Sequence, residues 1–124
     1  MGCLEKDNGW KCLKREAGFL LPAFRGGIKM FNTGAMQANE TYTINLESLS
    51  TYYYSAGQTV RPISIAQKYT GQNRHCLLNI AQNNIYYIHK DSQVDDWYQV
   101  SVDSEGVLTF TAKQYAQYGF IISI

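Results

Sequence analysis

Apolar and polar residues alternate along much of the chain with a period of two, the spacing that sends successive side chains of a β-strand to opposite faces. The pattern is clear where Tyr42, Ile44 and Leu46 alternate with polar residues. Similar stretches recur downstream, separated by short segments rich in Gly, Asn, Asp and Ser, which favour turns. The predicted strands cover residues 41–46, 51–55, 63–69, 75–80, 85–90, 97–102, 107–112 and 120–124.

Short strands at this spacing predict an all-β fold, an antiparallel β-sandwich with a jelly-roll-like arrangement. Single helical turns are expected only at 47–50 and 113–118, because no segment carries a sustained helical stripe. In the last strand, Phe120, Ile122 and Ile124 share one face, so we expect it to pair between two neighbours or at a protected edge. Residues 1–37 are polar and broken by glycines, which predicts an N-terminal arm or lead-in segment before a sandwich domain at 38–124.

The segments 75–80 and 85–90 should form a hairpin around a short polar loop. If Ile80 pairs with Ile85, then Cys76 faces His89, and the opposite side displays three apolar residues, Leu77, Tyr86 and Ile88. An antiparallel sheet in a monomer usually has one wet face, so two apolar faces indicate a central position or contact with another subunit. We therefore expect a homo-oligomer held by this hairpin or by the strand at 52–54.

Length and charge narrow the class of protein. The 124 residues suit one domain, and a formal net charge of +1 gives no field that would hold nucleic acid or an anionic membrane. No apolar run approaches the roughly 20 residues of a membrane span. We therefore expect neither a nucleic-acid nor a membrane partner. The cysteines, Cys3, Cys12 and Cys76, are odd in number and lack metal-site spacing, so we interpret them as thiols.

Candidate catalytic and metal-binding groups are sparse. The expected hairpin register would bring Cys76 beside His89, the arrangement of an activated thiol, but no third group is placed to orient the imidazole. His75 and His89 could share a metal ion, and the acidic run at 91–96 could offer oxygens to calcium, but neither has the ligand spacing of a known site. We expect no catalytic residue, no metal and no cofactor. We expect the protein to act by binding a partner.

Aromatic residues offer the best candidate ligand site. Tyrosine and tryptophan rings stack on the apolar faces of sugars, and neighbouring carboxylates accept hydrogen bonds from sugar hydroxyls. Strand alternation cannot hide every ring of the aromatic runs, although each ring alone could equally pack in the core or against another subunit. The predicted ligand-binding residues are Tyr53, Trp97, Tyr98, Asp95 and Asp96, with Tyr86 and Tyr115 as further candidates.

Residues 41–124 resemble the C-terminal β-sandwich, or tip domain, of bacteriophage and prophage tail-fibre or receptor-binding proteins. The matching segments are the opening strand at 41–46, the hairpin that ends in 86–88, the strand at 107–110 and the closing segment at 118–124. The segment Asp7-Asn8-Gly9-Trp10-Lys11 is similar to a short motif that often precedes such domains.

The resemblance implies a trimer that binds a host cell-surface receptor, a polysaccharide or a protein. It also implies a place in the virion, on the tail or capsid surface, after assembly in the bacterial cytoplasm. The alternative is a capsid head-fibre, decoration or tail-joining protein that contacts only other virion proteins, and a small hydrolase is a more distant third class. Binding of the isolated domain to host cells or glycan would separate the first two.

Overall fold

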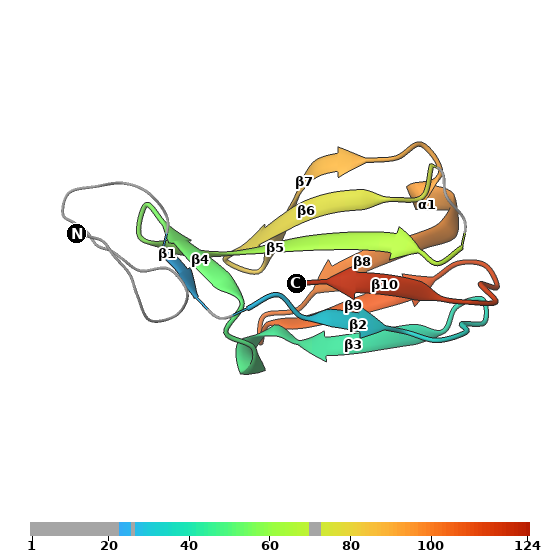
Figure 1. The fold of residues 1–124 in the computed structure, drawn as a ribbon, viewed down its shortest axis with the longest axis horizontal. Coiled ribbons are helices and arrows are strands. Elements are labelled where there is room, and N and C mark those ends of the chain that lie inside the picture. Colours follow the sequence, from blue (N-terminus) through green and yellow to red (C-terminus); the bar gives the residue numbers. More distant parts are fainter. Residues whose placement is uncertain (1–22, 26, 70–72) are drawn as a thin grey trace.

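A computed structural model describes residues 23–25, 27–69 and 73–124, and shows an antiparallel β-sandwich, which confirms the predicted all-β fold (Figure 1). The larger sheet contains seven strands and the smaller sheet three. Two short helices, η1 (Leu46–Ser48) and α1 (Val94–Trp97), lie between strands. The larger sheet consists of β1 (Ala23–Arg25), β2 (Met30–Asn32), β4 (Tyr52–Ser55), β5 (Gln58–Gln67), β6 (Cys76–Ala81), β7 (Asn84–Lys90) and β10 (Phe120–Ser123). The smaller sheet consists of β3 (Thr41–Asn45), β8 (Tyr98–Val102) and β9 (Val107–Ala112).

Strand β5 organises the larger sheet because it has two partners along one edge. Its first residues pair with β4 as far as Val60, and its last residues pair with β10 from Ser64 onward. Pro62 lies between these two pairings. Proline has no backbone N–H, and at this position no hydrogen bond to β4 or β10 is lost. The other edge of β5 pairs with β6 along most of its length. The strand predicted at 63–69 therefore begins five residues earlier, at the turn around Gly57.

Strands β2 and β3 run beside the last two strands of the chain, β10 and β9. Strand β2 pairs with β10 in the larger sheet, and β3 pairs with β9 in the smaller sheet. The β2–β3 connection and the β9–β10 connection therefore both pass from one sheet to the other, as in a jelly roll. Strand β10 lies between β5 and β2, so of the two placements expected for the last strand the structure shows pairing between two neighbours. Strand β2 and the buried Met36 belong to the sandwich although they precede the boundary expected at residue 38; residues 1–22 lie outside the described residues.

Three aromatic rings form the centre of the core. Tyr98 and Phe110 come from the smaller sheet and Phe120 from the larger, and their ring centroids lie 4.7–5.3 Å apart. All three are fully buried. Aliphatic side chains that follow the predicted alternation surround them: Ile44 and Leu108 from one sheet, and Ile63, Ile65, Leu78, Ile80 and Ile122 from the other.

The β6–β7 hairpin follows the expected register only near its turn. Ile80 pairs with Ile85 and Leu78 with Tyr87, but a bulge then shifts the register so that Leu77 pairs with His89 and Cys76 with Lys90. The bulge leaves Ile88 as the extra residue. The expected pairing of Cys76 with His89 is therefore wrong.

The side of this hairpin that carries Leu77, Tyr86 and Ile88 is exposed within one subunit, with exposed fractions of 36%, 56% and 64%. The expected helical turn near 47–50 is present one residue earlier as η1, whereas 113–118 is irregular and contains a single bridge between Met36 and Ala116.

Candidate functional site

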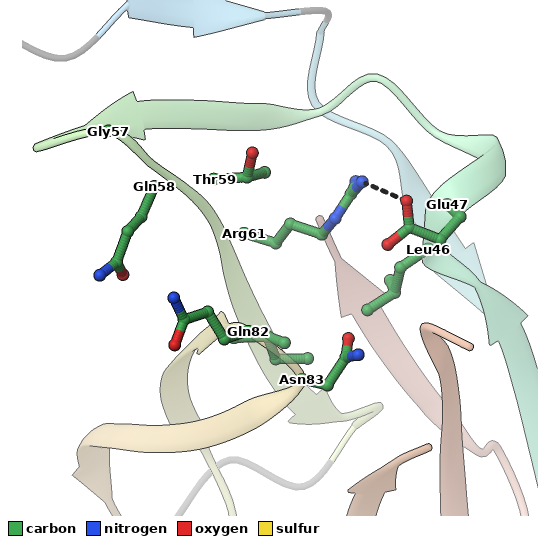
Figure 2. Close-up of a pocket in the computed structure, with 9 residues that line it drawn as sticks. Leu46, Glu47, Gly57, Gln58, Thr59, Arg61, Gln82 and Asn83 are labelled. Atoms are coloured by element: carbon green, nitrogen blue, oxygen red, sulfur yellow. Dashed lines mark ion pairs between the residues drawn. The ribbon is translucent and has the colours of Figure 1, made fainter. Parts of the chain in front are cut away.

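A polar cleft surrounds Arg61. It lies where η1, the β4–β5 turn and the β6–β7 turn meet, and it has two lobes that share Glu47, Thr59 and Arg61. Figure 2 shows the first of these lobes. We call the whole the Arg61 cleft. The amide lobe, about 330 Å³, is completed by Leu46, Gly57, Gln58, Ile80, Gln82 and Asn83. The tyrosine lobe, about 440 Å³, is completed by Ser48, Leu49, Ser50, Tyr52 and Tyr54.

Arg61 forms the wall between the lobes. It lies on β5 at the same inward-facing parity as Ile63 and Ile65, and only 7% of its surface is exposed. Its Nη1 donates a hydrogen bond to the Leu49 carbonyl oxygen at 3.2 Å, and its Nη2 lies 3.8 Å from Oε1 of Glu47. A guanidinium has five N–H donors, so this arrangement leaves donors with which to bind a ligand.

The backbone of η1 and a distant glycine position Glu47. Asn45 caps the short helix, because its side-chain oxygen accepts a hydrogen bond from the Glu47 N–H at 3.1 Å. The Glu47 side chain then lies over Gly106, where an ideal Cβ would approach Glu47 Cγ to 2.6 Å and Oε2 to 2.8 Å. Gly106 also has a φ of +82°, which a side chain rarely adopts. Gly106 therefore provides the space in which the Glu47 carboxylate faces Arg61.

Side-chain amides line the other side of the amide lobe. Gln82 and Asn83 form the tight β6–β7 turn, with φ values of +53° and +62°. The Asn83 amide donates to the Ser104 carbonyl oxygen at 3.2 Å, which ties this turn to the loop that contains Gly106. Figure 2 shows Gln58, Gln82 and Asn83 around the same space as Arg61 and Glu47. This lobe offers hydrogen-bond donors and acceptors in one place.

Tyrosine rings flank Arg61 in the second lobe. The Arg61 guanidinium carbon lies 5.3 Å from the centroid of the Tyr52 ring, within the range of a cation–π contact. Tyr52 and Tyr54 form an edge-to-face pair with centroids 5.3 Å apart. The lobe thus combines ring surface with the hydroxyls of Ser48, Ser50 and Thr59.

The residues predicted for ligand binding do not form one site. Tyr53 is half-buried on β4, where alternation places it opposite Tyr52 and Tyr54, whereas Asp95, Asp96 and Trp97 belong to α1. Figure 1 shows β4 and α1 at opposite ends of the sandwich.

The residues of α1 already contact other residues of the same chain. The Arg74 guanidinium lies over the Trp97 ring at 3.7 Å, and the Asp95 carboxylate accepts a hydrogen bond from Lys90 Nζ at 3.2 Å. The backbone carbonyl oxygen of Asp96 accepts a hydrogen bond from the Gln114 side-chain amide, and the Asp96 side chain is exposed.

The expectation that Tyr98 is exposed is wrong. Only 1% of its surface is accessible, because α1 ends at Trp97 and the first residue of β8 points into the core. The Tyr98 hydroxyl donates to the Arg74 carbonyl oxygen at 2.8 Å, which satisfies its polar group inside the protein. Burial also raises the pKa of the Tyr98 hydroxyl. Tyr98 is therefore a core residue and does not contribute to a ligand-binding surface.

Arg61 and the residues that converge on it are not among the residues predicted from the sequence. The lining comes from three segments far apart in sequence, near 46–52, 57–61 and 80–83, so no local motif marks it. The strand predicted from the sequence begins at residue 63, so the inward-facing position of Arg61 on β5 is visible only in the structure.

The groups considered for catalysis or metal binding are buried or hydrogen-bonded to other parts of the chain. Cys76 is a free, buried thiol, and burial raises its pKa, which disfavours the reactive thiolate. Asp91 accepts the backbone N–H of His75 at 2.9 Å and contacts His89 Nε2 at 2.6 Å, and these hydrogen bonds, with that from the His75 backbone foremost, lower the pKa of Asp91. Within the described ranges, no cluster of three or more His, Cys, Asp or Glu residues could hold a metal ion, and no helix is long and apolar enough to cross a membrane.

Comparison with known proteins adds no relative: no family model, curated protein or solved structure matches the chain.

Replacing Gly106 by alanine is expected to move the Glu47 carboxylate away from Arg61. A non-glycine residue at positive φ costs on the order of 1–3 kcal/mol, and the flexible Glu47 side chain should yield to the new methyl group. The NMR signal of Arg61 Nε–Hε reports the displacement, and urea unfolding reports the stability loss.

Gly34→Ala is the matched control, because Gly34 also has positive φ, at +70°, but an ideal Cβ there meets nothing within 4 Å. It should lose a similar free energy of unfolding and leave the Arg61 signal in place. An unchanged Arg61 signal in Gly106→Ala would show that Gly106 does not position Glu47.

Proposed function

We propose that the chain is a glycan-binding module of a phage or prophage virion, the tip domain of a tail fibre that attaches to a polysaccharide on the host surface. The observation that carries this proposal is the Arg61 cleft. In it, a buried guanidinium, a carboxylate, side-chain amides and tyrosine rings surround two adjoining lobes on an all-β sandwich. The resemblance of residues 41–124 to tail-fibre tip domains supports the placement in a virion.

The chemistry of the cleft suits sugars. Sugar hydroxyls both donate and accept hydrogen bonds, and the amides of Gln58, Gln82 and Asn83 can do the same. Arg61 donates only and the Glu47 carboxylate accepts only, which fixes the direction of hydrogen bonds at the shared wall. Tyrosine rings in the second lobe can lie against the apolar faces of a sugar ring. Two lobes with a common wall favour an extended chain of at least two sugar units.

The outer side of the β6–β7 hairpin supports a homo-oligomer, a trimer in the resembling family. Among the described residues β7 pairs only with β6, so its other edge is open, and Leu77, Tyr86 and Ile88 are exposed beside it. The polar side chains at the end of this strand contact groups of the same chain: Lys90 Nζ lies 3.2 Å from the Asp95 carboxylate, and His89 Nε2 lies 2.6 Å from the Asp91 carboxylate. The apolar residues on this open edge offer a surface that another copy of the chain can cover, so that the exposed edge of a strand is no longer in solvent.

This same surface favours the second candidate, a capsid decoration or tail-joining protein with protein contacts alone. In that case the hairpin would be the functional surface and the Arg61 cleft would bind nothing. A binding experiment on the cleft distinguishes the two functions.

The double variant Gln58→Ala/Gln82→Ala is expected to weaken binding to host-envelope polysaccharide by about tenfold, since two hydrogen bonds to sugar hydroxyls are lost. Both side chains are exposed, so the fold should be retained. Isothermal titration or a cell-binding assay measures the loss. Gln99→Ala removes an exposed amide from β8, away from the cleft, and should bind as the unmodified protein does. Equal binding by all three proteins would place the glycan site elsewhere.

The double variant Tyr86→Lys/Ile88→Lys is expected to convert the oligomer to a monomer, because it places positive charges on the apolar edge of every copy. Light scattering coupled to size exclusion gives the mass. Thr43→Lys adds a charge to the exposed face of β3, an edge strand of the other sheet, and should leave the mass unchanged. A monomeric unmodified protein at micromolar concentration would refute the oligomer.

A further inference from the structure

We infer that the Arg61 cleft takes an uncharged glycan and that Glu47 is the residue that excludes acidic ones. This inference rests on the proposed glycan binding and adds the charge of the ligand. It follows from which charges line the cleft and how exposed each of them is.

The lining carries one positive and one negative group. Arg61 and Glu47 belong to both lobes, and every other lining residue is uncharged. The Arg61 side chain is 9% exposed, whereas the Glu47 side chain is 64% exposed. A ligand that enters either lobe therefore meets the carboxylate more openly than the guanidinium.

The positive charge of Arg61 is already compensated. Its Nη2 lies 3.8 Å from Glu47 Oε1, and Nη1 donates to the Leu49 carbonyl oxygen, which also carries partial negative charge. An acidic sugar would have to compete with Glu47 for the guanidinium and would bring a second carboxylate beside the first. Like charges placed opposite one another disfavour a complex strongly, which is a common source of specificity.

A neutral sugar avoids this repulsion and uses the same groups. Its hydroxyls can donate to Glu47 and accept from Arg61 while the ion pair stays in place. The absence of a side chain at Gly106 leaves room for Glu47 on this side of the cleft. The cleft thus discriminates by charge as well as by shape.

Glu47→Gln tests the role of the carboxylate, because it keeps the shape of the side chain and removes its charge. Glu105→Gln is the matched control, since Glu105 is exposed in the neighbouring turn and does not line the cleft. The probes are uronic-acid-containing bacterial envelope polysaccharides, each with its carboxyl-reduced counterpart, immobilised on one array beside neutral envelope polysaccharides. Thermal unfolding checks that all variants are folded.

The unmodified protein and Glu105→Gln are expected to prefer the carboxyl-reduced form over the acidic form by about tenfold or more. In Glu47→Gln this preference should fall below about threefold or reverse, because Arg61 then lacks its counter-charge. Equal or tighter binding of the acidic form by the unmodified protein would overturn this inference but leave glycan binding intact. An unchanged preference in Glu47→Gln would remove the role given to Glu47. Binding to no polysaccharide of either kind would instead contradict the proposed function.

Discussion

The contact between Tyr98, Phe110 and Phe120 holds the two sheets together, and the position of β5 depends on it. Phe120 reaches the trio from β10, so the trio fixes β10 against the smaller sheet. Strand β10 then pairs with residues 64–67 of β5 and occupies that edge of the strand. Aromatic rings in such contact contribute area burial and a geometric preference together, which explains why this part of the core can set the register of its neighbours.

The candidate site follows from this constraint. Because β10 takes the second half of β5, the first half is free to pair with β4, and the two partners separate near Pro62. Arg61 lies at that point on the inward-facing side of β5, where it pairs with the core residue Ile80 of β6. A charge there needs a partner, which Glu47 supplies from η1, with Gly106 beneath it. The cleft thus lies at the polar first half of β5, and the β4–β5 and β6–β7 turns border it.

Sequence patterns predicted the strands well because burial of one face of a sheet forces alternation. They also predicted the hairpin register at Ile80 and Leu78, where a tight turn dictates the pairing. They failed at Cys76 because a bulge at Ile88 adds one residue, and nothing in a run of β-branched and aromatic residues marks where a bulge will occur. Tyr98 was misplaced for a similar reason: the short helix α1 changes the phase of alternation just before β8. The cleft itself could not be predicted, since three segments converge on Arg61 only after folding.

Glycan binding in the Arg61 cleft is the central claim, and an NMR titration tests it most directly. Fragments of carboxyl-reduced bacterial envelope polysaccharide would be added to the labelled protein while side-chain signals are followed. We expect shifts in the amide groups of Gln58, Gln82 and Asn83 and in Arg61 Nε–Hε, with the Trp97 indole unchanged. Shifts confined to Trp97 and the residues around Asp95, with the cleft signals unmoved, would contradict it.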